Sequence, residues 1–176
     1  MILTFPQSIG LGTSYLASDK LKLALDVEWI NWTNAFNKVT FKFSNGANPN
    51  IDSLLANNGS FNLDLPMYWK DAIVLKIGGE FCLNQDLTIR LGYAYRRNPV
   101  PQNTIFPVFP AIIENHLMVG TSYKVSTTLT IHAALEMRLN KSETANNPSL
   151  IANEYAGSTS QLSTTLIHLA AAYSFK

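Results

Sequence analysis

Three histidines are the side chains of this 176-residue chain that could bind a metal or transfer a proton near neutral pH. His116, His132 and His168 lie far apart in the sequence, and their spacing matches no metal-binding motif. Ser122 and Ser163 lack any surrounding motif that would make either hydroxyl a nucleophile. The sequence therefore predicts neither an enzyme nor a protein with a bound metal or cofactor.

The overall composition excludes several other classes of protein. The net charge is only +1, which gives no sign of a nucleic-acid surface. Cys82 is the single cysteine, so no internal disulfide can form. Charged residues make up 14% and hydrophobic residues 47%, but no run of about 18 apolar residues predicts a membrane-spanning helix. The first ten residues show neither the basic nor the apolar region of a signal peptide, so none is expected.

Apolar and polar side chains alternate along most of the chain, which is the pattern of β-strands with two different faces. Between Leu21 and Trp29 every odd-numbered residue is apolar, and the same phase resumes at Val39. We therefore predict one long strand over 21–43 that is irregular in its middle. Seven strands are predicted in total, at about 8–15, 21–43, 69–81, 87–96, 115–123, 129–139 and 163–175.

The connections between these segments alternate between short turns and long loops. The turns at 16–20, 82–86 and 124–128 follow a recurring pattern of Gly-x-x-aromatic, then Ser or Asn, then Leu-x-Ile or Leu-x-Leu. A soluble β-sandwich would also show alternating faces. The turn and loop asymmetry, with aromatic residues at the turn end of the apolar face, favours a bacterial outer-membrane β-barrel. Those aromatic residues are Tyr15, Phe81, Tyr123, Tyr173 and Phe175.

The odd number of predicted strands indicates that the barrel is larger than this sequence. Bacterial barrels of a single chain have even numbers of strands. Seven strands alone would leave two unpaired edges in lipid, where backbone groups find no partner. We therefore expect residues 1–176 to be the C-terminal part of one outer-membrane β-barrel domain, or the product of a truncated reading frame.

Four segments point to a particular family of barrels: ALDVEWINW (24–32), WKDAIVLKIGGEF (69–81), DLTIRLGYAYRRNPVP (86–101) and HLMVGTSYKV (116–125). Together they resemble the long-chain fatty acid transporters of the outer membrane, the FadL family. The resemblance implies a multi-pass barrel of fourteen strands, of which these are the last seven, set among outer-membrane lipid and lipopolysaccharide. It also implies an N-terminal half that carries a hatch, and passive uptake of long-chain fatty acids or other hydrophobic small molecules.

The resemblance and the strand phase together give two sets of candidate residues. Lys70 matches a family lysine that would meet the ligand headgroup, although it could instead pair with a carboxylate of the hatch or wall. The expected ligand contacts are Lys70, Trp32, Phe36, Val74, Met118, Phe106 and Phe109. Phe106 and Phe109 lie in a loop that forms either an outer hydrophobic groove or a self-packed surface loop. A charge network that holds the hatch is expected from Lys76, Glu80, Arg90, Glu136 and Arg138.

Two further functions remain open from the sequence. A barrel of the same fold could take up aromatic hydrocarbons instead of fatty acids. The long loops alone would also suit a surface protein that transports nothing, such as an adhesin, a porin-like channel or a phage receptor.

Overall fold

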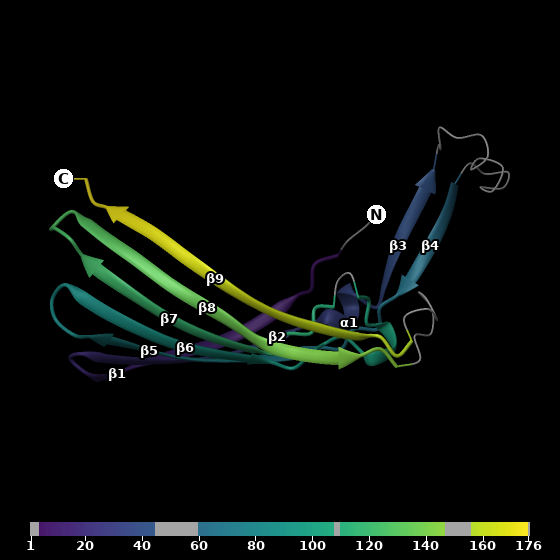
Figure 1. Ribbon diagram of the computed structural model, residues 1–176, viewed down its shortest axis with the longest axis horizontal. Helices are drawn as coiled ribbons and strands as arrows, with labels where there is room; N and C mark the ends of the chain where they lie inside the picture. The colour runs from purple at the N-terminus through teal and green to yellow at the C-terminus, as the bar shows by residue number, and fades with distance from the viewer. Residues whose placement is uncertain (1–3, 45–59, 108–109, 147–155, 176) are drawn as a thin grey trace.

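A seven-stranded antiparallel sheet forms most of the molecule (Figure 1). The computed structural model describes residues 4–44, 60–107, 110–146 and 156–175. The sheet order is β1-β2-β5-β6-β7-β8-β9, so β1 and β9 are its edges. The strands are β1 (Ser8–Ser18), β2 (Leu21–Ile30), β5 (Ala72–Cys82), β6 (Leu87–Arg96), β7 (Asn115–Lys124), β8 (Leu129–Thr144) and β9 (Thr159–Tyr173). The prediction of an all-β fold is confirmed.

The three tight turns of the sheet close on the side chain of a serine or an asparagine. The side-chain oxygens of Ser18, Asn84 and Ser126 each accept hydrogen bonds from the backbone N–H groups two and three residues later. Such side chains replace backbone acceptors in a turn and so favour it locally. The repeated sequence pattern therefore marks three copies of one turn structure.

The prediction of a single strand over 21–43 is wrong. The sheet strand β2 ends at Ile30 and is followed by a short helix, α1 (Trp32–Ala35). The side chain of Asn31 accepts a hydrogen bond from the N–H of Asn34, and Asp71 Oδ1 accepts one from the N–H of Thr33 at 3.0 Å. Because two side chains satisfy the free N–H groups at its start, the chain can turn into a helix here.

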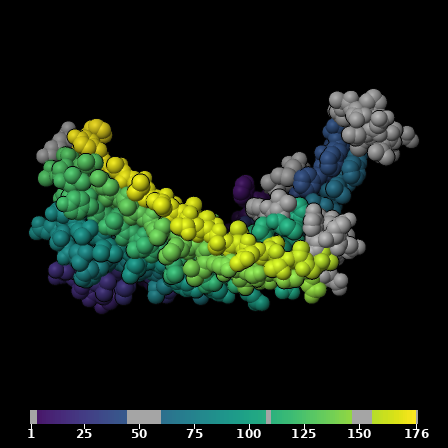
Figure 2. All heavy atoms as spheres, viewed as in Figure 1, coloured from purple at the N-terminus to yellow at the C-terminus, as the bar shows by residue number. Residues whose placement is uncertain are grey.

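The apolar residues after the helix belong to a separate two-stranded ribbon. The strand β3 (Lys38–Ser44) pairs with β4 (Ser60–Pro66), which lies between two of the predicted strands and is not itself predicted. The ribbon projects away from the main sheet (Figures 1 and 2). Its alternation is real, but its apolar side chains belong to the ribbon and not to the barrel wall. On the opposite face of the ribbon, Lys38 pairs with Asp64 at 2.6 Å.

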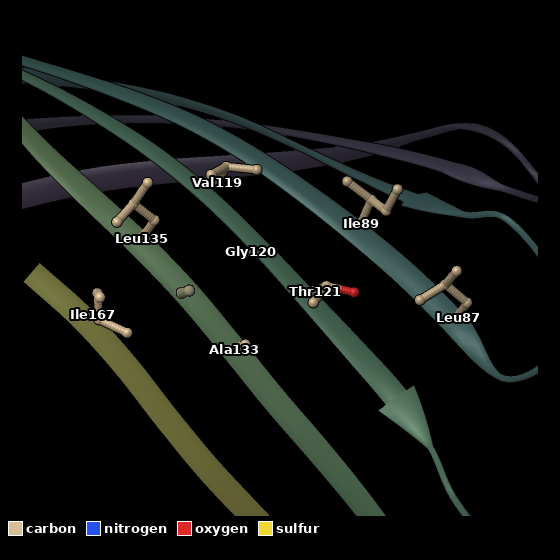
Figure 3. Close-up of a pocket in the computed structure, with 9 residues that line it drawn as sticks. Leu87, Ile89, Val119, Gly120, Thr121, Ala133, Leu135 and Ile167 are labelled. Atoms are coloured by element: carbon tan, nitrogen blue, oxygen red, sulfur yellow. The ribbon is translucent and has the colours of Figure 1, made fainter.

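The main sheet has one apolar and one polar face. The apolar face exposes large hydrophobic side chains along all seven strands, and the predicted aromatic residues lie exposed at its turn end. Thr121 and Ala133 have small side chains, which leave a shallow depression between Ile89, Leu135 and Ile167 (Figure 3). This arrangement suits a wall that faces lipid on one side and a lumen on the other.

Buried side chains gather at the loop end of the sheet. Trp69, Val100, Ile105 and Ala145 form a buried cluster, against which further hydrophobic residues pack. Those residues are Trp32, Phe36, Met67 and Ala111. Among the described residues, none of the helices is long and apolar enough to span a membrane. The buried cluster of Trp69, Val100, Ile105 and Ala145 gives the loop end a packed hydrophobic core of its own.

Candidate functional site

Ion pairs lie between and along the strands on the polar face of the sheet. Lys76 Nζ lies 2.9 Å from Glu28 Oε2, and Arg90 Nε lies 2.6 Å from Glu80 Oε2. On β8, Arg138 Nε lies 2.8 Å from Glu136 Oε1. The structure thus pairs the five residues expected in a charge network and adds Glu28 as a sixth member. Whether this network holds a hatch stays a prediction.

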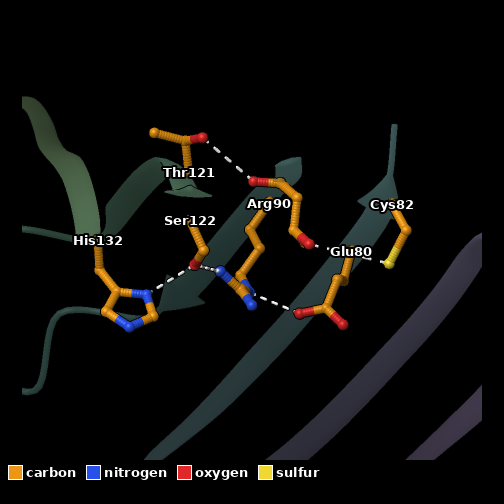
Figure 4. Close-up of polar contacts among 7 residues, drawn as sticks. Glu80, Cys82, Arg90, Thr121, Ser122 and His132 are labelled. Carbon is orange, nitrogen blue, oxygen red and sulfur yellow. Dashed lines mark hydrogen bonds and ion pairs between the residues drawn. The ribbon is translucent and has the colours of Figure 1, made fainter. Parts of the chain in front are cut away.

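Arg90 connects β6 to both of its neighbours (Figure 4). Its guanidinium contacts Glu80 on β5 and also donates a hydrogen bond to Ser122 Oγ on β7. Ser122 Oγ in turn lies 2.7 Å from His132 Nδ1 on β8. Within the described strands no carboxylate pairs with His132, so the serine and histidine lack the third group of a nucleophile relay. The chain of contacts ties four strands together instead.

Glu136 contacts the other two histidines, His116 and His168. Its carboxylate accepts from Arg138 and lies 3.2 Å from His116 Nδ1 and 3.7 Å from His168 Nε2. These residues come from three adjacent strands, β7, β8 and β9. Across the described ranges, no group of three His, Cys, Asp or Glu side chains has the geometry of a metal site. The cluster therefore brings one carboxylate, one guanidinium and two imidazoles together on this part of the polar face.

Next to this cluster the polar face holds a hollow of about 430 Å³. Val74 and Met118, two of the expected ligand contacts, both line it, whereas the charged lining comes from Lys76, Arg96 and Arg138, with the imidazole of His116 beside them. The remaining lining residues are Ile30, Ala94 and Tyr95. A site with an apolar floor and a few charged groups is the usual form of a pocket for an amphiphilic small molecule.

The strand register explains why the hollow forms at this place. Val74 pairs with Arg96 across β5 and β6, and Gly92 pairs with Met118 across β6 and β7. A Cβ atom added to Gly92 would lie 3.6 Å from both Cβ and Cε of Met118. The missing side chain at Gly92 thus gives Met118 room to lie along the sheet, which keeps the space above it open.

Trp32 and Phe36 occupy a different place from the one expected. The strand prediction put them on the lumen face, but Trp32 lies in α1 and Phe36 directly follows it. Phe36 stacks on Trp69 with ring centroids 4.7 Å apart, and Trp32 meets Trp69 edge-on at 5.1 Å. We call these three side chains the aromatic cluster. It lies at the loop end of the sheet and not on the polar face of the strands.

Lys70 lies outside the hollow. Its backbone N–H donates to the carbonyl of Pro99 at 2.8 Å, and its exposed side chain borders a second hollow of about 350 Å³ among the loops. Arg97, Glu114 and Glu143 also border this second hollow. Phe106 is partly buried in the same loop region, and Phe109 lies outside the described residues. The structure therefore does not bring Lys70 together with Val74 and Met118.

Glu114 connects the loops around the second hollow through a hydrogen bond and an ion pair. Its carboxylate accepts a hydrogen bond from the N–H of Asn98 at 2.8 Å and pairs with Lys141 at 3.0 Å. Burial acts to raise the pKa of Glu114, but the N–H of Asn98 and the ammonium of Lys141 outweigh it and hold the pKa below its ordinary value. The carboxylate is thus charged at neutral pH and fixes the loop between β6 and β7.

Arg96 is the arginine of the hollow that belongs to neither set of candidate residues. Strand phase alone places Arg96 on the polar face, beside Ala94 and Gly92. Nothing in the spacing of the sequence distinguishes it from Arg90 or Arg138, which have carboxylate partners. The distinguishing signal is three-dimensional, because it depends on which carboxylates the register brings near each guanidinium.

Comparison with known proteins gives one family. The sequence matches the family described as outer membrane protein transport protein (OMPP1/FadL/TodX) over residues 1–175. No curated protein matches it. Similar solved structures are the toluene transporter TbuX of Ralstonia pickettii (18% identity, TM-score 0.64) and a FadL homologue of Pseudomonas aeruginosa (18%, 0.64). The match covers 96% of this chain in both cases, but only 33% and 35% of the other chain.

The toluene transporter TodX of P. putida is similar as well, with 24% identity and a TM-score of 0.61 over 79% of this chain and 29% of that one. These likenesses establish the fold. The present chain spans about a third of the length of these solved proteins.

Proposed function

Since the chain belongs to the FadL and TodX family of outer-membrane transport proteins, we propose that it forms the C-terminal half of a barrel for the passive uptake of long-chain fatty acids. Proteins of this family are outer-membrane barrels that cross the membrane with strands, and the apolar face described above suits that location. The family carries hydrophobic compounds. The proposal therefore concerns which class of hydrophobic ligand is transported and which portion of the barrel this chain forms.

The observation that carries the proposal is the composition of the hollow on the polar face. Apolar side chains such as Val74 and Met118 share it with the cations Lys76, Arg96 and Arg138. A fatty acid has an alkyl chain for the first set and a carboxylate for the second. An aromatic hydrocarbon such as toluene has no charged group, so it would form no ion pair with these cations and would gain only the weaker attraction between a cation and an aromatic ring.

The open sheet supports the proposal that another segment completes the barrel. The strands β1 and β9 lie at opposite edges of the described sheet, and neither edge can stay unpaired in lipid. In this proposal an N-terminal half supplies the remaining strands and a hatch. Arg90 and Glu80 on the lumen face would then contact the hatch, and outer-membrane lipid and lipopolysaccharide would contact the apolar face.

At the mouth, the aromatic cluster and the exposed ammonium of Lys70 form the proposed entry point. Trp69 is buried, while Trp32 and Phe36 remain partly accessible. A ligand would meet aromatic surface first and Lys70 beside it, before it reaches the hollow. Lys70 thus has a proposed role in attraction of the headgroup and not in its final binding.

Uptake measurements on the complete protein test the proposal. Cells that lack their own fatty acid transporter would express the complete protein, and entry of labelled oleate and labelled toluene would be measured. We expect oleate uptake that falls by several fold in Lys70→Ala, with Lys124→Ala at the turn end of β7 as the matched control. Uptake of toluene without oleate would refute the fatty acid proposal in favour of an aromatic hydrocarbon channel. Uptake of neither would favour a surface protein that transports nothing.

A further inference from the structure

The hollow on the polar face contains one more cation than the nearby carboxylates can pair. Lys76 is paired with Glu28, and Arg138 is paired with Glu136. Arg96 has no carboxylate within ion-pair distance anywhere in the part of the chain that the structure describes. The hollow therefore has an excess of about one positive charge at neutral pH, and Arg96 carries it.

The guanidinium of Arg96 is also incompletely hydrogen-bonded. Its Nε atom is buried from solvent and has no hydrogen-bond partner. A buried donor without a partner destabilises the structure unless another group binds to it. The backbone at Arg96 is tied to the start of β7, because its N–H donates to the carbonyl of Glu114 at 2.9 Å. The side chain of Arg96 lines the hollow beside Lys76 and Arg138, and its Nε donor is not used by any described group.

We propose that Arg96 binds the anionic headgroup of the transported ligand. This inference rests on the proposed function and makes it more specific. The ligand has a single negative charge that matches the excess charge, and its apolar tail lies along Val74 and Met118. A carboxylate suits this role because it can accept two parallel hydrogen bonds from one guanidinium.

Two other partners for Arg96 lead to different expectations. A carboxylate from the remaining strands or the hatch could pair with Arg96, in which case the residue stabilises the barrel and does not select ligands. A neutral hydrophobic ligand could fill the hollow without contact to the guanidinium. Each alternative predicts that removal of the charge has equal effects on charged and neutral ligands of the same length.

Arg97 provides a matched control for Arg96. It follows Arg96 directly, has the same charge and is exposed at the second hollow among the loops. Arg96→Gln and Arg97→Gln therefore make the same change in net charge at neighbouring positions of the chain. Any effect of long-range attraction would appear in both variants, whereas direct binding of the headgroup would appear only in Arg96→Gln.

The experiment measures binding of oleate and of oleyl alcohol to the purified complete protein. We expect Arg96→Gln to weaken oleate binding by roughly tenfold to hundredfold, the usual effect of losing a charge-assisted hydrogen bond, and to leave oleyl alcohol unchanged. Arg97→Gln should leave the affinity for both ligands within about twofold of the unmodified protein. Arg96→Lys should retain part of the preference for oleate, because it keeps the charge but not the planar fork.

Several results would overturn the inference. If oleate binding survives Arg96→Gln, or if both ligands weaken equally, Arg96 does not bind the headgroup, although the transport proposal stands. A lower thermal midpoint with an unchanged ratio of oleate to oleyl alcohol affinity would identify a carboxylate of the barrel as its partner. If neither ligand binds the unmodified protein, the proposed function itself fails together with the inference.

Discussion

Replacement of Trp69 tests whether the aromatic cluster holds the mouth of the barrel together. Trp69 is 4% exposed, stacks on Phe36 and meets Trp32 edge-on. Replacement of a buried Trp by Ala typically costs about 3–5 kcal/mol. The substitution also removes two aromatic pairs, each worth about 0.5–1.5 kcal/mol, and the range for Trp→Ala already includes part of this energy. We therefore expect Trp69→Ala to lower the local stability of the mouth by about 4 kcal/mol.

Trp69→Phe separates packing from hydrogen bonding at the same position. The indole Nε1 of Trp69 is buried without a partner. The unsatisfied donor destabilises the folded state by about 1–3 kcal/mol, and Phe removes that cost. Phe also buries less ring area, equivalent to about two methylene groups, which costs about 1.6 kcal/mol. These two terms nearly cancel, so Trp69→Phe should change the stability of the mouth by less than about 1 kcal/mol.

Hydrogen exchange of backbone amides in the complete protein measures these changes locally. The N–H of Phe36 donates to the carbonyl of Trp32, and the N–H of Met67 donates to that of Asn37. A loss of about 4 kcal/mol makes the opened state roughly a thousandfold more populated, so both amides should exchange about a thousandfold faster in Trp69→Ala. Phe5→Ala is the control, since this aromatic side chain is 88% exposed. Exchange in Trp69→Ala that is less than tenfold faster would refute the role of the cluster.

Three further predictions concern the hollow, the two faces of the sheet and the loops. Gly92→Leu should push Met118 into the hollow and weaken oleate binding by about tenfold, as measured by titration. Val119→Lys, on the apolar face, should lower the free energy of unfolding in bilayers by about 2–4 kcal/mol, whereas Thr164→Lys on the polar face should have little effect. Since the pKa of Glu114 is lowered in the folded state, its stabilisation of the loops is complete above its ordinary value of 4.5 and is lost as the pH falls through the folded value. Proteolysis of the loop between β6 and β7 should therefore accelerate in acid, and Glu114→Gln should remove this dependence.

The sheet could be predicted from sequence because its pattern is local. Each strand exposes one face to lipid and one to the lumen, so the period of two continues along its whole length. The turns could also be predicted from the sequence, since Ser18 and Asn84 accept hydrogen bonds from residues at most three positions away. Structure that depends on neighbours in the sequence is therefore the part that the residue pattern predicts well.

The same reasoning explains the failure over 21–43. The alternation at Val39, Phe41 and Phe43 continues the phase of β2 by coincidence, because an excursion through α1 separates the two segments. Phase tells which side chains share a face but not to which sheet that face belongs. The partner of β3 is β4, about twenty residues further along, and no local pattern names that partner.

Candidate site residues divide in the same way. Val74 and Met118 both line the hollow, since strand phase alone decides that they lie on the polar face, and their contact with a ligand stays a prediction. Trp32 and Phe36 do not, because the side chain of Asp71, distant in sequence, helps to hold α1 in place of a strand. Strand phase places Arg96 among the inward cations but in neither candidate set, because its distinguishing property is the lack of a partner, which only the full arrangement of charges shows.

The Trp-Lys-Asp segment shows why a family motif does not by itself identify a ligand contact. Each of its residues ties a different part of the loop end to the start of β5: Trp69 packs in the aromatic cluster, the backbone of Lys70 holds Pro99, and Asp71 caps α1. The hydrogen bond from Thr33 lowers the pKa of Asp71, so this cap is charged and strong at neutral pH. These contacts account for the tryptophan, for the aspartate and for the backbone of the lysine, but not for the lysine side chain. The exposed ammonium of Lys70 is therefore the one part of the motif left for a ligand, and only a side-chain substitution tests it.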